Sequence, residues 1–140
     1  MHLIVYLSDY NGPADQVDDV LEDIVRVAKR ENMKRDITGV LFFVQNKFLQ
    51  IIEGQEGDLR QLMKNIAADP RHGRMEYLID TKVESKGFRQ WNMDSFRLDA
   101  GRTFDTKVLR ELTESFKQSL MPRSNTLVFY YQTLLNQQPA

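Results

Sequence analysis

The clearest hydrophobic pattern lies in residues 36–54, which read DITGVLFFVQNKFLQIIEG. Two short apolar runs, rich in β-branched and aromatic residues, flank a turn-like segment at 45–47 and predict a β-hairpin. Because side chains alternate between the faces of a strand, Phe48, Gln50 and Ile52 share one face of the second run. A buried amide at this position costs about 1–3 kcal/mol unless its hydrogen bonds are met. Gln50 therefore indicates that something polar faces the strand: protein, water or a ligand.

The same alternation predicts three further strands, and a repeat near 3.6 residues predicts helices between them. The strands fall at 2–8, 75–83 and 91–96, and the first helix falls at 14–31. The second helix opens at Gly57 and Asp58, with Asp58 as its N-cap, and the sequence DPRHG at 69–73 ends it. Residues 2–8 are apolar on both faces, which is typical of a central strand.

The order strand, helix, strand, strand, helix, strand, strand predicts an α+β fold, a ferredoxin-like βαββαββ mixed sheet with two helices on one face. The other face would carry an apolar patch too large to leave in water, made of Leu3, Val5, Leu7, Leu49 and Ile51. Amphipathic stretches at 105–120 and 124–135 are expected to cover this face, to form a subunit contact, or to do both. Residues 1–98 would then form one domain, and residues 99–140 a C-terminal helical extension packed on the sheet.

The composition is that of an ordinary soluble globular chain, and it removes several classes of function. The chain has 140 residues, 41% of them hydrophobic and 28% charged, with a formal net charge of −1. This balance favours neither nucleic acid nor an acidic membrane as a partner. The lack of cysteine excludes disulfides and thiolate chemistry, and with only two histidines we expect no metal site. The first residues, MHLIVYLS, have neither the basic region nor the length of a secretory signal or a membrane span, so we expect a cytoplasmic protein.

Sequence signatures of common enzymes are missing. The chain has no Walker-type GxxxxGK[ST], no GxGxxG after a strand and no GxSxG elbow. A small enzyme of acylphosphatase-like fold would need an arginine in a phosphate-binding loop near the first strand, and residues 8–13 contain none. The acidic residues of the first helix are best interpreted as a solvated face near the positive end of the helix. We therefore do not expect an enzyme.

A set of polar and apolar residues should converge between the helices and the sheet. Tyr6 and Gln50 project from two strands that the fold brings together, and Asn32 sits just past the first helix. Ile24 and Ile66 lie on the inward faces of the two helices. A hydroxyl, two amides and two isoleucines suit a flat heteroaromatic ligand, whose faces the isoleucines would contact and whose polar edge the amides would bind. The alternative is a domain with a few satisfied buried polar groups and no ligand.

Five short segments occur together in a characteristic order and spacing. They are LIVYLS around Tyr6, Asn32 followed by DITGVL, FLQIIEG around Gln50, DPRH at 69–72 and WNM at 91–93. In this combination the chain resembles the BLUF family of blue-light sensors that use flavin, and the resemblance covers about residues 1–98. The tail is similar to that of short, stand-alone members without a fused output domain.

The resemblance implies a non-covalent FAD between the two helices, for which FMN or riboflavin can substitute. Asn32 and Gln50 would hydrogen-bond the polar edge of the flavin, and Ile24 and Ile66 would sandwich its ring. Tyr6 would give an electron and a proton to the excited flavin. Gln50 would relay the proton and end rotated or tautomerised, which an amide can do with little change of shape because its two ends have the same size.

Two further groups of residues match the family. Asp69, Arg71 and His72 match positions near the ribityl and phosphate end of the flavin, although a helix C-terminus favours a cation without any ligand. Trp91 and Met93 match a pair that could exchange places beside the glutamine when the 91–96 strand shifts. The simpler interpretation of this pair is an aromatic residue of the core or its rim and a flexible gap filler.

The resemblance also implies how the signal leaves the protein. We expect it to pass through the C-terminal part to a separate effector protein, and we expect a homo-oligomer, with no nucleic acid and no membrane as partner. The competing hypothesis is a light-insensitive ferredoxin-like interaction module that keeps the fold without flavin.

Overall fold

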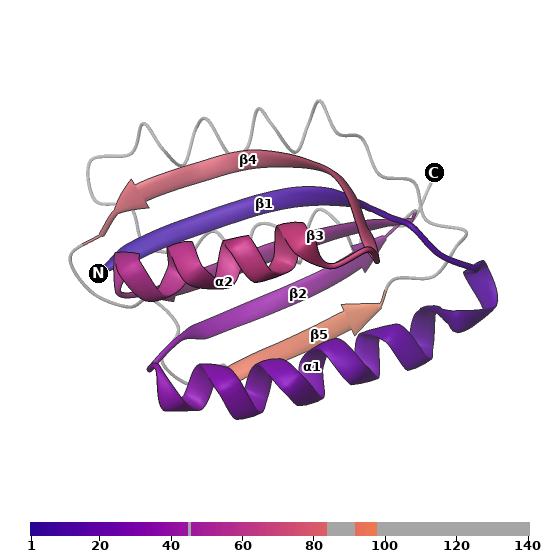
Figure 1. The fold of residues 1–140 in the computed structure, drawn as a ribbon, viewed down its shortest axis with the longest axis horizontal. Coiled ribbons are helices and arrows are strands. Elements are labelled where there is room, and N and C mark those ends of the chain that lie inside the picture. The colour runs from indigo at the N-terminus through magenta and orange to yellow at the C-terminus, as the bar shows by residue number, and fades with distance from the viewer. Residues whose placement is uncertain (45, 84–91, 98–140) are drawn as a thin grey trace, which may run out of the picture.

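The computed structural model describes residues 1–44, 46–83 and 92–97, which form one mixed sheet with two helices (Figure 1). The elements in chain order are β1 (His2–Tyr10), a 3-10 turn (Ala14–Gln16), α1 (Val17–Lys34), β2 (Thr38–Val44), β3 (Lys47–Gly54), α2 (Glu56–Ala68), β4 (His72–Lys82) and β5 (Asn92–Arg97). The predicted α+β class and βαββαββ order are confirmed.

The strands lie in the order β4-β1-β3-β2-β5. The first four pair antiparallel, and β5 pairs parallel with β2 at one edge. Both α1 and α2 lie on the same face of the sheet (Figure 1). As predicted, β1 is an inner strand, and Leu3, Ile4 and Val5 are each 0% exposed.

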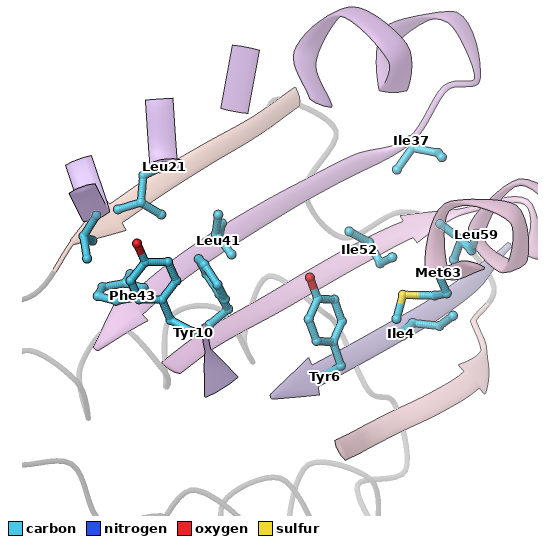
Figure 2. Packing of buried hydrophobic residues seen from close by; sticks show 12 residues of the cluster. Ile4, Tyr6, Tyr10, Leu21, Ile37, Leu41, Phe43, Ile52, Leu59 and Met63 are labelled. Carbon is cyan, nitrogen blue, oxygen red and sulfur yellow. The ribbon is translucent and has the colours of Figure 1, made fainter. Parts of the chain in front are cut away.

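A hydrophobic core lies between this face and the two helices. Alternate residues of the strands, among them Ile4, Leu41 and Ile52, pack against Leu21 of α1 and Leu59 of α2 (Figure 2). Each fully buried side chain of this size contributes about 1.5–3 kcal/mol to folding. The apolar stripe of each helix therefore fixes how α1 and α2 lie on the sheet, and this arrangement positions the site.

The opposite face of the sheet is also buried. Its predicted apolar patch, Leu3, Val5, Leu7, Leu49 and Ile51, is at most 5% exposed. The helices predicted at 105–120 and 124–135 lie outside the described residues.

The predicted hairpin turn is present between β2 and β3. Asn46 has a φ of 61°, a left-handed conformation that asparagine tolerates better than most residues. Its carbonyl accepts a hydrogen bond from the backbone N–H of Tyr10 at 2.8 Å, so the turn is tied to the end of β1.

Several element boundaries differ from the prediction: β1 runs on to Tyr10, and α1 begins at Val17, after the 3-10 turn. The predicted cap at Asp58 is wrong: α2 begins at Glu56 after Gln55, and Asp58 lies in the first turn, where an acid suits the positive helix end. Helix α1 runs to Lys34, so Asn32 lies inside it rather than past it; its carbonyl accepts the N–H groups of Arg35 and Ile37 at 3.1 and 2.9 Å. Strand β4 begins at His72, three residues earlier than predicted.

No helix in the described part of the chain combines the length and the apolar character needed to cross a membrane.

Candidate functional site

A pocket of about 270 Å³ opens between α1, α2 and the sheet. Its lining includes eight residues predicted from the sequence: Tyr6, Ile24, Asn32, Gln50, Ile66, Asp69, Arg71 and His72. This volume is near the lower end for ligand pockets, about 300 Å³, so it suits a ring system rather than a whole dinucleotide.

The floor of the pocket holds a buried hydrogen bond between two strands. Tyr6 of β1 and Gln50 of β3 are direct partners across the sheet. Tyr6 rises on the same face as Ile4 and Ile52 (Figure 2), and its hydroxyl donates to Oε1 of Gln50. Both residues are nearly inaccessible to water: Tyr6 is 1% exposed and Gln50 is 4% exposed. Burial raises the pKa of the Tyr6 hydroxyl far above its usual range, so this group stays a neutral donor.

Asn32 supplies a second polar group, from α1. The residue is 2% exposed and lines the pocket. Its Nδ2 has no hydrogen-bond partner among the described residues. A buried donor without a partner costs about 1–3 kcal/mol, so this amide fits a ligand with an acceptor at its edge.

The side walls of the pocket are apolar. Ile24 of α1 and Ile66 of α2 are partly buried, pack against the core and line the pocket. Two isoleucines from opposite helices can contact the two faces of a flat ring, and the buried amides can read its edge. The residues present therefore fit a flavin ring.

One end of the pocket is charged. Arg71, just after α2, donates from Nη2 and Nε to Asp69 at 2.6 and 3.0 Å and from Nη1 to Asp23 of α1 at 2.9 Å. These bonds from Arg71 are the main reason why the pKa of both carboxyls lies below its usual range. Asp69, and then Asp23, raise the pKa of the guanidinium in turn. The fully charged form of this set is therefore the stable one.

Asp23 is a member of this set that the sequence did not reveal. The sequence placed it on the solvated face of α1, and its partner lies 48 residues away. Nothing in the local pattern indicates such a contact, which only the docking of α1 beside the end of α2 creates.

His72 lies between Tyr6 and the charged end. Its Nδ1 and the hydroxyl of Ser8 are 2.9 Å apart, and its ring meets the edge of the Tyr6 ring with centroids 6.2 Å apart. Burial lowers the pKa of His72, so the neutral imidazole is favoured at neutral pH.

The predicted pair on the last strand is only partly described. Trp91 lies outside the described residues, and Met93 is part of β5. The register of β5 on β2 slips between Asn92, which pairs with Gly39, and Asp94, which pairs with Val40. The simple alternation predicted along this strand is therefore interrupted at Met93.

Within the described ranges, no three His, Cys, Asp or Glu side chains are grouped so that they could hold a metal ion.

Comparisons with known proteins point to one family. Residues 1–94 match the family described as "BLUF: Sensors of blue-light using FAD". Photoactivated adenylate cyclase subunit beta of Euglena longa is 30% identical over 125 residues, which are 86% of this chain and 14% of that protein. The chain spans only 14% to 19% of the length of the curated relatives that it matches in Euglena longa, Euglena gracilis (subunit beta) and Escherichia coli.

Two solved structures are similar over most of the chain. The photo-activated state of BlsA has a TM-score of 0.70 and 26% identity, covering 100% of this chain and 99% of that one. The dark-state structure of BlrB, a BLUF protein, has a TM-score of 0.64 and 27% identity, covering 84% and 81% of the two chains.

Proposed function

This chain belongs to the BLUF family, the sensors of blue light that use FAD, and we propose that it binds its flavin in the pocket between α1 and α2. The observation that carries this proposal is the buried hydrogen bond from Tyr6 to Gln50 on the pocket floor. It couples a redox-capable phenol to a side chain with two alternative hydrogen-bonding ends. Such a pair is what a light-driven rearrangement of hydrogen bonds requires.

Four residues would hold the ring. The unpartnered amide of Asn32 would donate to the polar edge of the flavin, and Gln50 would contact the same edge. Ile24 and Ile66 would contact the two faces of the ring. Because the pocket has a volume of only about 270 Å³, the ring would fill it and the rest of FAD would extend outward. FMN or riboflavin would then fit the same pocket.

The light response would begin at Tyr6. A bound flavin supplies an electron acceptor once it has absorbed blue light. Tyr6 gives the electron, and the proton on its oxygen leaves along the existing hydrogen bond to Oε1 of Gln50. Burial keeps the phenol protonated in the dark, so the proton is present when it is needed. When the electron and the proton return to Tyr6, Gln50 is left rotated or tautomerised, so the polarity of its hydrogen bonds is reversed without a change of volume.

The rearranged Gln50 would act on neighbouring strands. Gln50 pairs with Leu41 of β2, and β2 pairs with β5, the strand that carries Met93. A change at Gln50 therefore has a short path to β5 and to Trp91 just before it. We assign the switching role to Met93 and Trp91 together, as a shift of this strand.

Residues 1–98 would form the flavin-binding domain, and residues 99–140 a helical extension that covers the second face of the sheet. The buried apolar residues of that face, such as Val5 and Ile51, support the need for a cover. The extension would pass the signal to a separate effector protein, and the sensor would form a homo-oligomer. Its role would be sensing rather than turnover, in contrast to the adenylate cyclases named among its relatives.

The absorption spectrum of the purified protein tests this function. We expect flavin absorption in the blue and a light-induced spectral shift that reverses in the dark. A protein that purifies colourless and does not bind added FAD would contradict the proposal and favour a light-insensitive interaction module.

A further inference from the structure

The charged end of the pocket contains one carboxylate that reaches in from outside. Asp69 and Arg71 line the pocket, whereas Asp23 is absent from the described residues that line it. Asp69 is fixed by its own turn, because the backbone N–H of Arg71 also donates to it at 2.9 Å. Asp23 instead comes from α1 and accepts only one bond from Arg71, donated by Nη1 at 2.9 Å. Nε and Nη2 of the guanidinium thus bond to Asp69 of the same turn, and Nη1 bonds to Asp23 of α1.

The bond between Asp23 and Arg71 can be exchanged for another at little cost. Asp23 has a second cation, because Nη2 of Arg26 donates to its other oxygen at 2.6 Å. Its side chain is 43% exposed, and that of Arg71 is 32% exposed. If Nη1 of Arg71 turned to a different anion, Asp23 would keep Arg26 and contact with water. Neither charge would be left buried without a partner.

The position of this pair suits the far end of a flavin. Asn32, which fits the polar edge of the ring, follows Asp23 on α1 by nine residues, or about 13 Å along the helix axis. A flavin with its polar edge at Asn32 would direct its side chain toward Arg71. The terminal phosphate of FMN carries nearly two negative charges at neutral pH, and even one N–H of a guanidinium forms a strong charge-assisted hydrogen bond to such an anion.

We propose that Asp23 is a specificity-determining residue: its carboxylate competes with the flavin phosphate for Arg71 and limits the preference of the pocket for phosphorylated flavins over riboflavin. This inference rests on the proposed flavin-binding function. Asp23 need not touch the flavin, because it acts through the guanidinium that it occupies.

The test is a set of fluorescence titrations of the flavin-free full-length chain with riboflavin and with FMN. The quantity of interest is the ratio of the two dissociation constants, because a general loss of folded protein affects both equally. Asp23→Asn should raise the preference for FMN by up to about fivefold, the upper end of the effect of one exposed ion pair. Its affinity for riboflavin should stay unchanged.

Asp19→Asn is the matched control. Asp19 carries the same charge one turn earlier on α1, so this variant removes an equal amount of negative charge from the same helix. We expect its ratio to change by much less, because charges separated by about 10 Å are largely screened at ordinary ionic strength. Equal effects of the two variants would reduce the role of Asp23 to general charge and would overturn the proposal.

A double variant separates competition from other effects. In an Arg71→Gln background, Asp23→Asn should no longer change the ratio, because the group that both anions contest is gone. Parallel changes of riboflavin and FMN affinity in Asp23→Asn, or an unchanged ratio, would refute this inference and leave flavin binding intact. If neither flavin bound to the unaltered chain, the proposed function itself would fail, and this inference with it.

Discussion

Tyr6 and Gln50 form a buried hydrogen bond; Tyr6 is 1% exposed to water and Gln50 is 4% exposed. An unpartnered polar group there costs about 1–3 kcal/mol, so both side chains should stay bonded in every populated state. The amide can meet this requirement in two orientations, as an acceptor or as a donor toward Tyr6. The pair is therefore a two-state element made of only two residues.

Tyr6→Phe should separate flavin binding from the light response. The ring remains to fill the core, so flavin should still bind, but the proposed donor of the electron and proton is lost, and the light-induced spectral shift should disappear. Absorption spectra before and after blue light measure this. Tyr10→Phe is the matched control, because the Tyr10 hydroxyl donates to the carbonyl of Pro13 at 2.9 Å, away from the pocket lining. A normal shift in Tyr6→Phe would show that Tyr6 is not the donor.

At the scale of elements, the end of β3 is packed tightly beneath α2. A Cβ added at Gly54 would lie 3.1 Å from Cγ1 of Ile37 and 3.4 Å from Cδ2 of Leu59, and both of these residues are at most 1% exposed. By contrast, a Cβ added at Gly57 in α2 would meet nothing within 4 Å among the described atoms.

Gly54→Ala and Gly57→Ala should therefore change stability in opposite directions. Overpacking at Gly54 should lower the free energy of unfolding by about 1–3 kcal/mol. Alanine at Gly57 should raise it by up to about 1 kcal/mol, because the unfolded chain loses freedom and the helix gains a better helix former. Urea unfolding of both variants measures the two changes. A neutral Gly54→Ala would mean that Ile37 and Leu59 can move aside.

The other attachment of α2 is an ion-pair set with strands β1 and β4. Arg60 of α2 makes two bonds to Asp80 of β4, at 2.6 and 2.8 Å, and the ring of His2 in β1 lies 2.5 Å from the same carboxylate. Arg60, and then His2, lower the pKa of Asp80 from its usual 3.8. A carboxyl with a lowered pKa in the folded state contributes stability above its unfolded pKa, and loses this contribution as the pH falls through the folded value.

Asp80→Asn should consequently lower the free energy of unfolding at pH 7. The difference in stability between the variant and the unaltered chain, the stability gap, should narrow as the pH drops below about 4. Urea midpoints at several pH values measure the gap. Asp19→Asn serves as the control for removal of an acid on a solvated helix face. A gap that stayed constant down to pH 2 would contradict the role of the Asp80 charge.

Most of the helices and strands were predictable from the sequence, because the local periodicity of apolar residues determines them. Gln50 was recognised as unusual because an amide interrupts an apolar face, and Ile24 and Ile66 because they repeat at helical spacing. The boundaries were less predictable: Asn32 lies inside α1 because its carbonyl is satisfied by Arg35 and Ile37, a detail of the helix end. The contact of Asp23 with Arg71 could not be predicted from the sequence, because it depends on how elements distant in the sequence pack together.

At the scale of the whole molecule, both faces of the sheet are buried, and only one is covered by described helices. Under the function proposed above, residues 99–140 would cover the second face. That face contains Leu3, Val5 and Ile51, each 0% exposed. Exposed together, such residues form a patch that promotes association in water.

A chain shortened to residues 1–98 should therefore self-associate. Size-exclusion chromatography with light scattering should show larger species than for the full chain at the same concentration. The pocket residues all precede position 98, so the shortened chain should still bind flavin. If it stayed monomeric and soluble, the second face would not depend on the extension for its cover.

The pairing of β5 with β2 contains one extra residue on β5. Asn92 pairs with Gly39 and Asp94 with Val40, so Met93 has no direct partner on β2. Irregularities of this kind travel along a strand in whole residues, and each step exchanges the faces of the residue it passes. Displacement along this edge is therefore quantised. Each molecule would then be in one register or the other, and the intensity of the light would set only the fraction of molecules that switch.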